Sequence, residues 1–325
     1  MHRPTRSILA LVPLAWLAAG CVTIQTLGAR RQPLVETLVL GESGPKVLLL
    51  DIDNIISEID LEGPLGIGGV ESTVARVREQ LDKAKEDDAV EALLLRINSP
   101  GGGVTASDVV YHEILAFKKE REVPVVAQMM GMATSGGYYV AMASDWIQAH
   151  PTTVTGSIGV ISAGINLSGL MEQHGVANQT ITGGAFKDAG SPLRPMTPDE
   201  RAYLQGVVDD MHARFRSVVK QGRPALSEPQ VLALSDGRVY TATQALEHGL
   251  VDAIGYLTDA VDEVERRVDA PEVRVVSYHR EREWRSNIYS TAPAAPRSHA
   301  DLAQALGLDR GPAFLYLWWP GGLAR

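Results

Sequence analysis

Three short stretches of this sequence contain the kinds of residues that hydrolytic chemistry uses. Ser135 stands in "MMGMATSGGYYVAMASD" (Met129–Asp145), between small residues and two glycines. A glycine-rich run, "NSPGGGV" (Asn98–Val104), precedes it, and an isolated lysine, Lys187, lies in "ITGGAFKDAGSPLRP". These residue types would suit a nucleophile, backbone donors for a developing negative charge, and a base.

Ser135 could be a nucleophile or a helix cap. A serine at a strand-to-helix turn presents its side chain, and the free N–H groups of a helix start favour negative charge. Gly136 and Gly137 would let a substrate backbone approach closely. A serine N-cap is also common at a helix start, so this stretch alone leaves both interpretations open.

The glycines after Pro100 could form an oxyanion hole. Pro100 favours a turn, and Gly101, Gly102 and Gly103 free the backbone so that peptide N–H groups can point into a site. The alternative is a flexible turn between a strand and a helix. A phosphate-binding loop is disfavoured, because no Lys-Ser or Lys-Thr pair follows the glycines.

A serine nucleophile needs a base, and two residues are candidates. His150 in "QAHPTTVTG" is the histidine nearest to Ser135 in sequence, but a histidine before proline is commonly only a turn residue. Lys187 is surrounded by glycines and small residues. Carried inward, it would be desolvated, which favours the neutral amine that can accept a proton. The ordinary alternative for a lysine is a solvated surface position.

Alternating strands and helices predict how these stretches are positioned. We expect buried strands at Lys46–Ile56, 91–97 and Pro124–Met130, with amphipathic helices between them at 71–90 and 106–122. This order predicts a parallel sheet with crossover helices. Ligands of such sheets bind beyond the carboxyl ends of the strands, and both glycine-rich breaks fall there.

Further along, the strongest helix pattern covers Met196–Val219. Thr197 can cap it, and Glu200 completes a capping box. The pattern of apolar residues and glycines over residues 237–268 then predicts a helix, a short strand and another helix, which close the domain.

The N-terminus resembles a bacterial lipoprotein signal over residues 1–20. Arg3 and Arg6 precede 13 apolar or small residues, fewer than the roughly 20 that a membrane-spanning helix needs. Cys21, the chain's single cysteine, follows "LAAG" as the lipidated cysteine of a lipobox does. A chance cysteine after an ordinary secretory signal is the alternative. Residues 21–45 are expected to be a linker from the lipid anchor.

Composition limits the class of protein and its partners. The chain has 325 residues, of which 45% are hydrophobic and 21% charged, as in an ordinary globular protein. Its formal net charge of −9 argues against a nucleic-acid partner. The sequence offers no site for a metal or a nucleotide, so we expect no cofactor.

Five stretches, in this order, resemble the signal peptide peptidase A family: "RINSPGGGV", "MATSGGYYVAMASD", "TVTGSIGVI", "GAFKDAGSPLRPMTPDER" and "GRVYTATQALEHGLVD". The similarity covers about Lys46 to Val268. This family consists of serine peptidases that share a fold with the Clp protease and crotonase groups. The resemblance implies an α/β fold, a parallel-sheet ββα spiral, with a single catalytic domain over residues 46–270. Residues 271–325 match nothing in the family and form an extension of unknown role.

The resemblance also implies roles for individual residues. Ser135 matches the family's nucleophile, and Lys187, 52 residues later, matches its general base. Ser157 in "TGSIG" matches a residue that orients the lysine. The family's oxyanion hole is formed by backbone N–H groups, and the glycines that match it here are Gly101, Gly102 and Gly136. Gly102 is the preferred donor and Gly136 is the second.

The implied function is hydrolysis of short apolar peptides, such as remnant signal peptides, at the bacterial cell envelope. The implied assembly is an oligomeric ring or dome in which the serine and the lysine come from neighbouring subunits. Many family members have a transmembrane anchor, whereas this chain is expected to carry a lipid at Cys21, with its catalytic domain outside the cytoplasm. Two alternatives stay open: the same fold with a triad based on His150, and a non-catalytic scaffold that binds envelope peptides.

An aromatic, uncharged stretch lies near the end of the chain, "FLYLWWPGGL" (Phe314–Leu323). It could pack on the domain, rest at a membrane interface, or lie in a substrate groove. The sequence leaves these three uses open.

Overall fold

The computed structural model describes five segments of the chain: residues 32–60, 71–281, 283, 285–291 and 313–318. The expected signal peptide and Cys21 lie outside these residues. Among the helices of the described segments, none is both long enough and apolar enough to cross a membrane.

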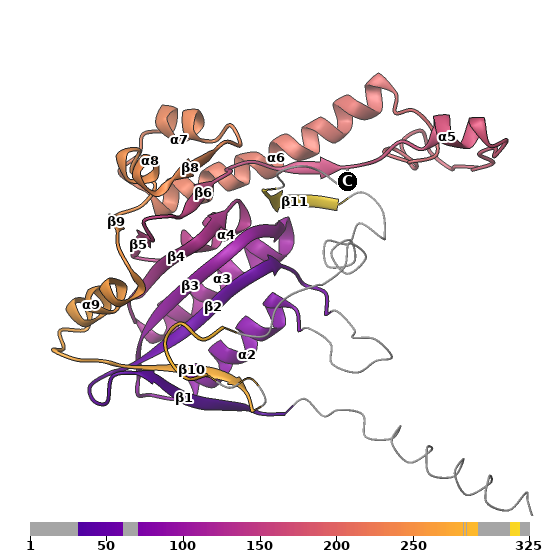
Figure 1. Ribbon diagram of the computed structural model, residues 1–325. Helices are drawn as coiled ribbons and strands as arrows, with labels where there is room; N and C mark the ends of the chain where they lie inside the picture. Colours follow the sequence, from indigo (N-terminus) through magenta and orange to yellow (C-terminus); the bar gives the residue numbers. More distant parts are fainter. Residues whose placement is uncertain (1–31, 61–70, 282, 284, 292–312, 319–325) are drawn as a thin grey trace, which may run out of the picture.

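A large β-sheet forms the centre of the molecule (Figure 1). Its main path runs β1-β10-β2-β3-β4-β5-β9; β1 pairs antiparallel with β10, and every later pair on the path is parallel. The strands on this path are β1 (Leu34–Leu40), β2 (Lys46–Ile56), β3 (Val90–Gly103), β4 (Val125–Thr134), β5 (Trp146–Ala149), β9 (Ala253–Ile254) and β10 (Arg274–Arg280). The three expected strands, β2, β3 and β4, are adjacent and parallel as predicted.

Both faces of the sheet are covered by helices. Leu93 and Leu95 of β3 point into the larger hydrophobic core, which they share with α2 (Thr73–Lys85) and α3 (Val104–Arg121). Leu94, on the opposite face, packs in a second core with α9 (Leu257–Arg267). Strands that are buried on both faces read as continuous apolar runs, which is why these strands could be predicted from the sequence.

Beyond the carboxyl end of β4 the chain builds a second layer. α4 (Gly136–Ala141) follows β4 directly, β6 (Val154–Gly156) extends the sheet along β4, and β8 (Val239–Thr241) pairs with β6. The helices of this layer are α6 (Pro198–Gly222), α7 (Glu228–Leu234) and α8 (Ala242–Glu247). The predicted capping box of Thr197 and Glu200 starts α6, and the predicted closing unit is α8, β9 and α9.

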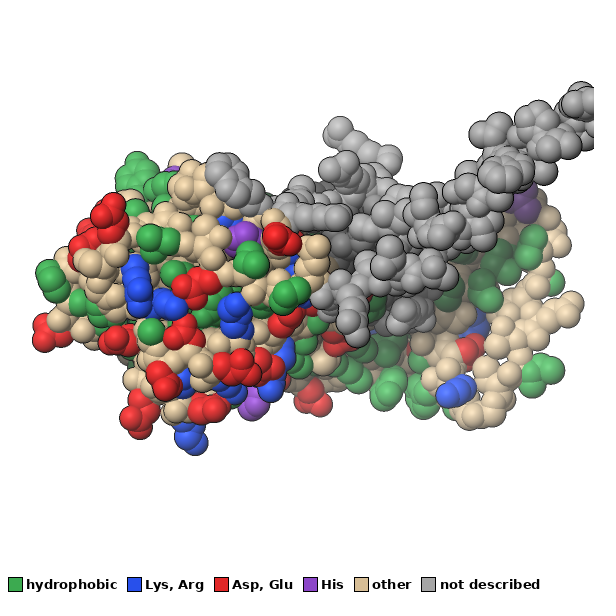
Figure 2. Space-filling model, turned by 90° about the horizontal axis from the view of Figure 1, so that it is seen from below, with side chains coloured by type: hydrophobic (Ala, Val, Ile, Leu, Met, Phe, Trp, Pro, Cys, Tyr) green, Lys and Arg blue, Asp and Glu red, His purple; other side chains and the backbone are tan. Residues whose placement is uncertain are grey.

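Residues 161–197 form an arm that leaves the body of the molecule (Figure 1). The arm begins with β7 (Ile161–Ala163), contains α5 (Ser168–Gln173), and returns to the start of α6. Its exposed apolar side chains include Ile165, Leu170, Val176, Ile181 and Phe186. In Figure 2, hydrophobic side chains gather at the end of the molecule where the arm lies.

The apolar stripe of α6 is packed only along its second half. Phe215 and Val218 are fully buried, whereas Leu204 and Val207 are only partly covered. The first half of α6 runs beside the arm, away from the sheet (Figure 1). The described residues therefore cover the first half of this stripe only in part.

The sheet includes segments on both sides of the predicted domain. β1 lies within residues 21–45, which were expected to be a linker, and β10 lies within the expected C-terminal extension. β1 is an edge strand with one half-exposed face. Its alternation of apolar and polar residues is therefore easily missed between the polar segments on either side. β11 (Ala313–Leu317) pairs with β3 and β7, so the first part of the aromatic stretch packs on the domain as a strand, while residues 319–323 lie outside the described residues.

Candidate active site

Ser135 lies at the junction of β4 and α4. Its N–H donates to the carbonyl of Gly156 at 2.7 Å, and its own carbonyl accepts from the N–H of Tyr139 at 2.9 Å. The backbone at Ser135 has φ 51° and ψ −115°, a conformation that is uncommon for a residue with a side chain and that clusters at active sites. A short helix start joined to β6 therefore fixes the position of Ser135.

The hydroxyl of Ser135 is buried and has no hydrogen-bond partner among the described residues. Ser135 occupies the N-cap position of α4, yet its side chain makes no capping hydrogen bond. A buried hydroxyl without a partner costs about 1–3 kcal/mol. Of the two interpretations left open by the sequence, capping does not account for this side chain.

The glycines predicted for the oxyanion hole come together beside Ser135. A Cβ atom added to Gly101, where φ is +101°, would lie 2.7 Å from the backbone N of Gly136. A Cβ added to Gly136 would lie 3.2 Å from the N of Gly102. The end of β3 and the start of α4 therefore meet closely, and only residues without side chains fit there.

Ser157 is placed next to this junction by the end of β6. It follows Gly156, whose carbonyl holds the N–H of Ser135, and its own N–H donates to the carbonyl of Arg238 at 2.8 Å. Ser157 is buried and has φ 51°. The structure thus brings Ser157 and the three glycines to the neighbourhood of Ser135.

Lys187, in contrast, is carried away from Ser135 by the arm. Its side chain is exposed, and its backbone N–H donates to the carbonyl of Gly184 at 3.2 Å. A buried serine hydroxyl without a partner and an exposed lysine do not form a dyad within one chain.

Arg194 is a functional candidate that the sequence analysis missed. Its guanidinium binds both carboxylate oxygens of Asp188, at 2.7 and 2.8 Å, and also pairs with Glu200 at the start of α6. Hydrogen bonding to Arg194 lowers the pKa of Asp188 and that of Glu200, the latter to about 2. Asp188 directly follows Lys187, so this ion cluster fixes the part of the arm that carries Lys187. The alternation of charges in "KDAGSPLRPMTPDE" was the available signal.

His150 is not brought to Ser135. It lies at the end of β5, where its Nδ1 lies 2.9 Å from Oγ1 of Thr152 and 3.2 Å from the backbone N of Thr152. Its ring makes an edge contact with Tyr256, with 5.1 Å between the ring centroids. The described contacts of His150 are those of a turn residue.

Tyr316 of β11 is the second residue that the sequence analysis missed. β11 runs antiparallel to the glycines of β3, with Tyr316 opposite Gly102. Its ring stacks on Tyr139, with 5.1 Å between the ring centroids, and lies 4.7 Å from the ring of Phe215. Burial raises the pKa of Tyr316 and of Tyr139. The aromatic character of 314–319 was visible in the sequence, but its position more than 200 residues from Gly102 left the contact unpredictable.

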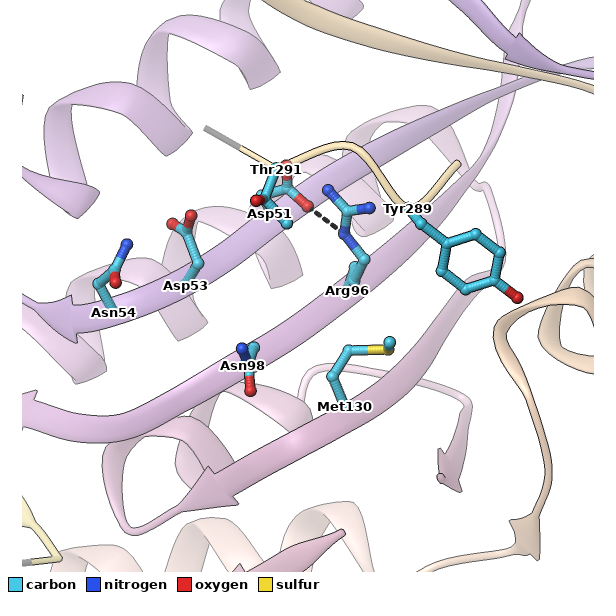
Figure 3. Close-up of a pocket in the computed structure, with 8 residues that line it drawn as sticks. All are labelled: Asp51, Asp53, Asn54, Arg96, Asn98, Met130, Tyr289 and Thr291. Atoms are coloured by element: carbon cyan, nitrogen blue, oxygen red, sulfur yellow. Dashed lines mark hydrogen bonds and ion pairs between the residues drawn. The ribbon is translucent and has the colours of Figure 1, made fainter. Parts of the chain in front are cut away.

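A pocket of about 190 Å³, lined by several charged and amide side chains, lies elsewhere on the sheet (Figure 3). Its side chains come from β2, β3, β4 and residues 289–291: Asp51, Asp53, Asn54, Arg96, Asn98, Met130, Tyr289 and Thr291. Because successive side chains of a strand point to opposite faces of the sheet, Asp51 and Arg96 lie on the face opposite α2 and α3. None of the residues predicted for catalysis lines this pocket.

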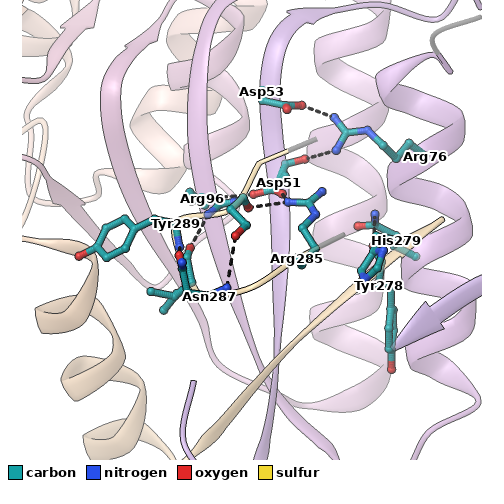
Figure 4. A network of polar contacts seen from close by, with 12 residues as sticks. Asp51, Asp53, Arg76, Arg96, Tyr278, His279, Arg285, Asn287 and Tyr289 are labelled. Atoms are coloured by element: carbon teal, nitrogen blue, oxygen red, sulfur yellow. Dashed lines mark hydrogen bonds and ion pairs between the residues drawn. The ribbon is translucent and has the colours of Figure 1, made fainter. Parts of the chain in front are cut away.

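The residues around this pocket form a buried ionic network (Figure 4). Asp51 accepts hydrogen bonds from Arg96 Nε at 2.6 Å and from Arg285 Nη1 at 2.8 Å. Both guanidinium groups also donate to the carbonyl of Ser290 at 2.7 Å. The network therefore ties residues 285–291 to the centre of the sheet and has a structural role.

Comparisons with known proteins agree with this fold. The family model described as Peptidase family S49 matches residues 117–270, and the Clp protease model matches residues 62–153. An Enterococcus faecium protein named as a signal peptide peptidase SppA is 38% identical over 75% of this chain and 70% of its own length. A protease of Synechocystis sp. is 38% identical over 63% of this chain and 71% of its own length. The chloroplast serine protease SPPA of Arabidopsis thaliana is 30% identical over 76% of this chain and 36% of its own length.

The fold and these similarities define a serine peptidase with a Clp-like α/β fold. Both the fold class and the enzyme class agree with the predictions made from the sequence. The chain belongs to peptidase family S49, the signal peptide peptidase family.

Proposed function

We propose that this serine peptidase uses Ser135 as its nucleophile and Lys187 as its general base, and that a neighbouring subunit supplies the lysine. The observation that carries the proposal is the buried hydroxyl of Ser135, which has no hydrogen-bond partner in the described part of its own chain. A nucleophile in that state lacks only a base. Lys187 stands on an arm whose exposed apolar side chains suit an interface with a second copy.

In this mechanism the neutral amine of Lys187 takes the proton of the Ser135 hydroxyl as Oγ attacks the scissile carbonyl carbon. The backbone N–H groups of Gly102 and Gly136 stabilise the resulting oxyanion. The ammonium then returns the proton to the leaving amine, and the peptide bond breaks. A water molecule, deprotonated by the same amine, releases the acyl group from Ser135. Ser157 orients the lysine.

The proposed substrates are short apolar peptides such as cleaved signal peptides. The buried surroundings of Ser135 favour an apolar chain in extended form. The proposed location is the bacterial envelope, with the protein held by a lipid on Cys21. An envelope peptidase of family S49 fits both the acidic composition and the names of the relatives.

The test is covalent labelling together with peptide cleavage by the assembled protein. A serine-reactive probe is expected to modify Ser135, as located by mass spectrometry, and Lys187→Ala is expected to lower kcat/KM by about 10³-fold or more. Lys119→Ala is the matched control, because Lys119 is also exposed and stands on α3. Full activity of Lys187→Ala, or loss of activity in His150→Ala with wild-type stability, would overturn the proposal in favour of a histidine base.

A further inference from the structure

We propose that Ser99 is a positioning residue for the oxyanion hole: its hydroxyl holds the peptide N–H of Gly101 and so directs the next N–H, that of Gly102, toward the reacting carbonyl. The inference rests on the proposed function and deepens it, since it says which of the matched glycines donates and what keeps that donor in place. Ser99 acts through the backbone and does not touch the substrate.

The first argument is an irregularity in the pairing of β2 with β3, just before the glycines. The register of the two strands shifts between Asp53 and Ile55, so that Asn54 alone lies opposite two residues of β3, Ser99 and Pro100. A bulge of this kind redirects a strand and is frequent next to active sites. Because Pro100 has no N–H, the backbone donors of this segment begin with the glycines that follow it.

The second argument is the place of the Ser99 hydroxyl inside this bulge. Ser99 is fully buried, and its Oγ accepts the N–H of Gly101 at 3.1 Å. Its single proton goes to the carbonyl of Asn54, which is closer than the other carbonyl within reach, that of Gly101 at 3.4 Å. The N–H of Gly101 is therefore engaged by Ser99, which favours Gly102 as the donor to an oxyanion.

The third argument is the backbone of Asn54, which receives the proton of Ser99. Asn54 lies near the end of β2 (Figure 3) and has φ 59°. This is the left-handed region, which asparagine enters more readily than most residues with a side chain. Strained residues of this kind persist only where the surrounding structure holds them, and they cluster at functional sites. The strain at Asn54 thus accompanies the contact that supports the glycine turn.

The fourth argument is the close packing of this turn on the start of α4, directly after the nucleophile. A Cβ atom on Gly136 would lie 3.2 Å both from the Cα of Gly101 and from the N of Gly102. A Cβ atom on Gly137 would lie 2.9 Å from the carbonyl oxygen of Ser99. A shift of the turn therefore changes the spacing of the two proposed donors, and a misplacement of about 1 Å can slow a reaction by about 10²-fold.

The test compares wild type with Ser99→Ala, and Ser72→Ala is the matched control. Ser72 is also buried, and its hydroxyl accepts the N–H of Ala75 at 3.2 Å at the start of α2. Each variant loses a buried serine hydroxyl that accepts a backbone N–H, so both should lower Tm. We expect Ser99→Ala to lower kcat by about 10–100-fold and to change KM by less than about twofold. Ser72→Ala should keep both parameters.

A transition-state analogue distinguishes loss of the oxyanion hole from general damage. With a peptide aldehyde, Oγ of Ser135 adds to the aldehyde carbon, the hydroxyl proton passes to the base, and the former carbonyl oxygen enters the oxyanion hole. The Ki of the aldehyde should rise in Ser99→Ala by about the factor by which kcat falls. The Kd of an uncleaved peptide, measured in Ser135→Ala with and without Ser99→Ala, should change by less than about twofold.

Variants of Asn54 test the same contacts without removing a buried hydroxyl. Asn54→Val disfavours a positive φ, so the carbonyl should move away from Ser99 and kcat should fall by about tenfold or more. Asn54→Gly is the matched control, because glycine keeps the positive φ, and its kcat should be that of wild type. Combining Asn54→Val with Ser99→Ala should give less than the product of the two losses, because both act through one hydrogen bond.

Wild-type kcat in Ser99→Ala, a fall in kcat without a matching rise in the Ki of the aldehyde, or equal kcat in Asn54→Val and Asn54→Gly would overturn the inference. Probe labelling of Ser135 separates it from the proposed function. If wild type is labelled at Ser135 and Ser99→Ala cleaves peptides with wild-type kcat, only the role of Ser99 fails. If Ser135 is not labelled in wild type, the proposed function fails.

Discussion

Ser135 combines a strained backbone, full burial and a hydroxyl without a partner in the described part of the chain. Each of these features opposes stability, so the surrounding structure must hold the residue in place. Its N–H bond to Gly156 and its position at the end of β4 do so. Such a conformation is expected where a side chain must be ready to react.

Gly136→Ala is expected to reduce catalysis more than stability. The added Cβ would meet Ser107 Oγ at 2.4 Å and the N of Gly102 at 3.2 Å, and would push one oxyanion donor from its place. Loss of one donor lowers kcat by about 10²–10³-fold. Gly131→Ala is the control, because its Cβ would meet only Asn98 Oδ1 at an ordinary 3.6 Å. Steady-state kinetics and Tm of both variants check this; wild-type kcat in Gly136→Ala would contradict the assigned donors.

The positions of the proposed catalytic residues could be predicted from the sequence to differing extents. Ser135, Ser157 and the glycines lie where strand ends meet, and strand order already predicts that edge. The arm that carries Lys187 leaves the body, and no local pattern gives its direction. The contact of Tyr316 with Gly102 is non-local, and the sequence left three uses for that segment open.

Among the elements, the return of the arm onto α6 depends on one arginine. Arg194 holds Asp188 and Glu200 together, and the ring of Phe186 contacts Tyr203 of α6, with 5.4 Å between centroids. The arm is otherwise exposed. The ion cluster therefore sets where Lys187 is presented.

Arg194→Ala is expected to lower kcat by about tenfold or more through misplacement of Lys187, while probe labelling of Ser135 and oligomer size persist. The matched control is Arg78→Ala, which removes an exposed arginine of α2 that pairs with Asp82 of α2 and Glu113 of α3. The readout is kcat together with the labelling yield and light scattering. Equal kcat in the two variants would argue against a positioning role for Arg194.

The ion cluster of Arg194, Asp188 and Glu200 is expected to persist at low pH. The folded pKa of Glu200 is lowered to about 2 from 4.5, so its contribution to stability is present above about pH 4.5 and is lost as pH falls through about 2. Carbon-detected NMR of the Glu200 carboxyl should give a midpoint near 2 in wild type and a higher one in Arg194→Ala, where the hydrogen bond from the N–H of Thr197 remains. A midpoint above 4 in wild type would contradict the cluster.

Asp51 should be the most important ion-pairing residue for stability. Asp51→Asn leaves the buried guanidinium groups of Arg96 and Arg285 without their carboxylate, and breaking a buried pair costs roughly 3–5 kcal/mol. Asp82→Asn, which breaks an exposed pair with Arg78, should cost about 1 kcal/mol or less. Urea unfolding measures both. Equal losses in the two variants would contradict a buried network.

At the scale of the whole molecule, the described residues leave the Ser135 hydroxyl without a hydrogen-bond partner and the apolar side chains of the arm exposed. The parallel core was predictable, because its strands read as apolar runs and its helices as amphipathic repeats. The strands β1 and β11 were not predictable, because their pairing partners are distant in sequence. An assembly that covers the arm would also bring a lysine to each serine.

The most direct test of this account mixes two inactive proteins, Ser135→Ala and Lys187→Ala. If the dyad forms between subunits, unfolding, mixing at equal amounts and reassembly give sites with an intact serine from one subunit and an intact lysine from the next. Random mixing in a closed ring predicts recovery of about a quarter of the wild-type activity, which should disappear on dilution below the assembly concentration. No recovery, from mixed oligomers whose size matches that of active wild type, would contradict it.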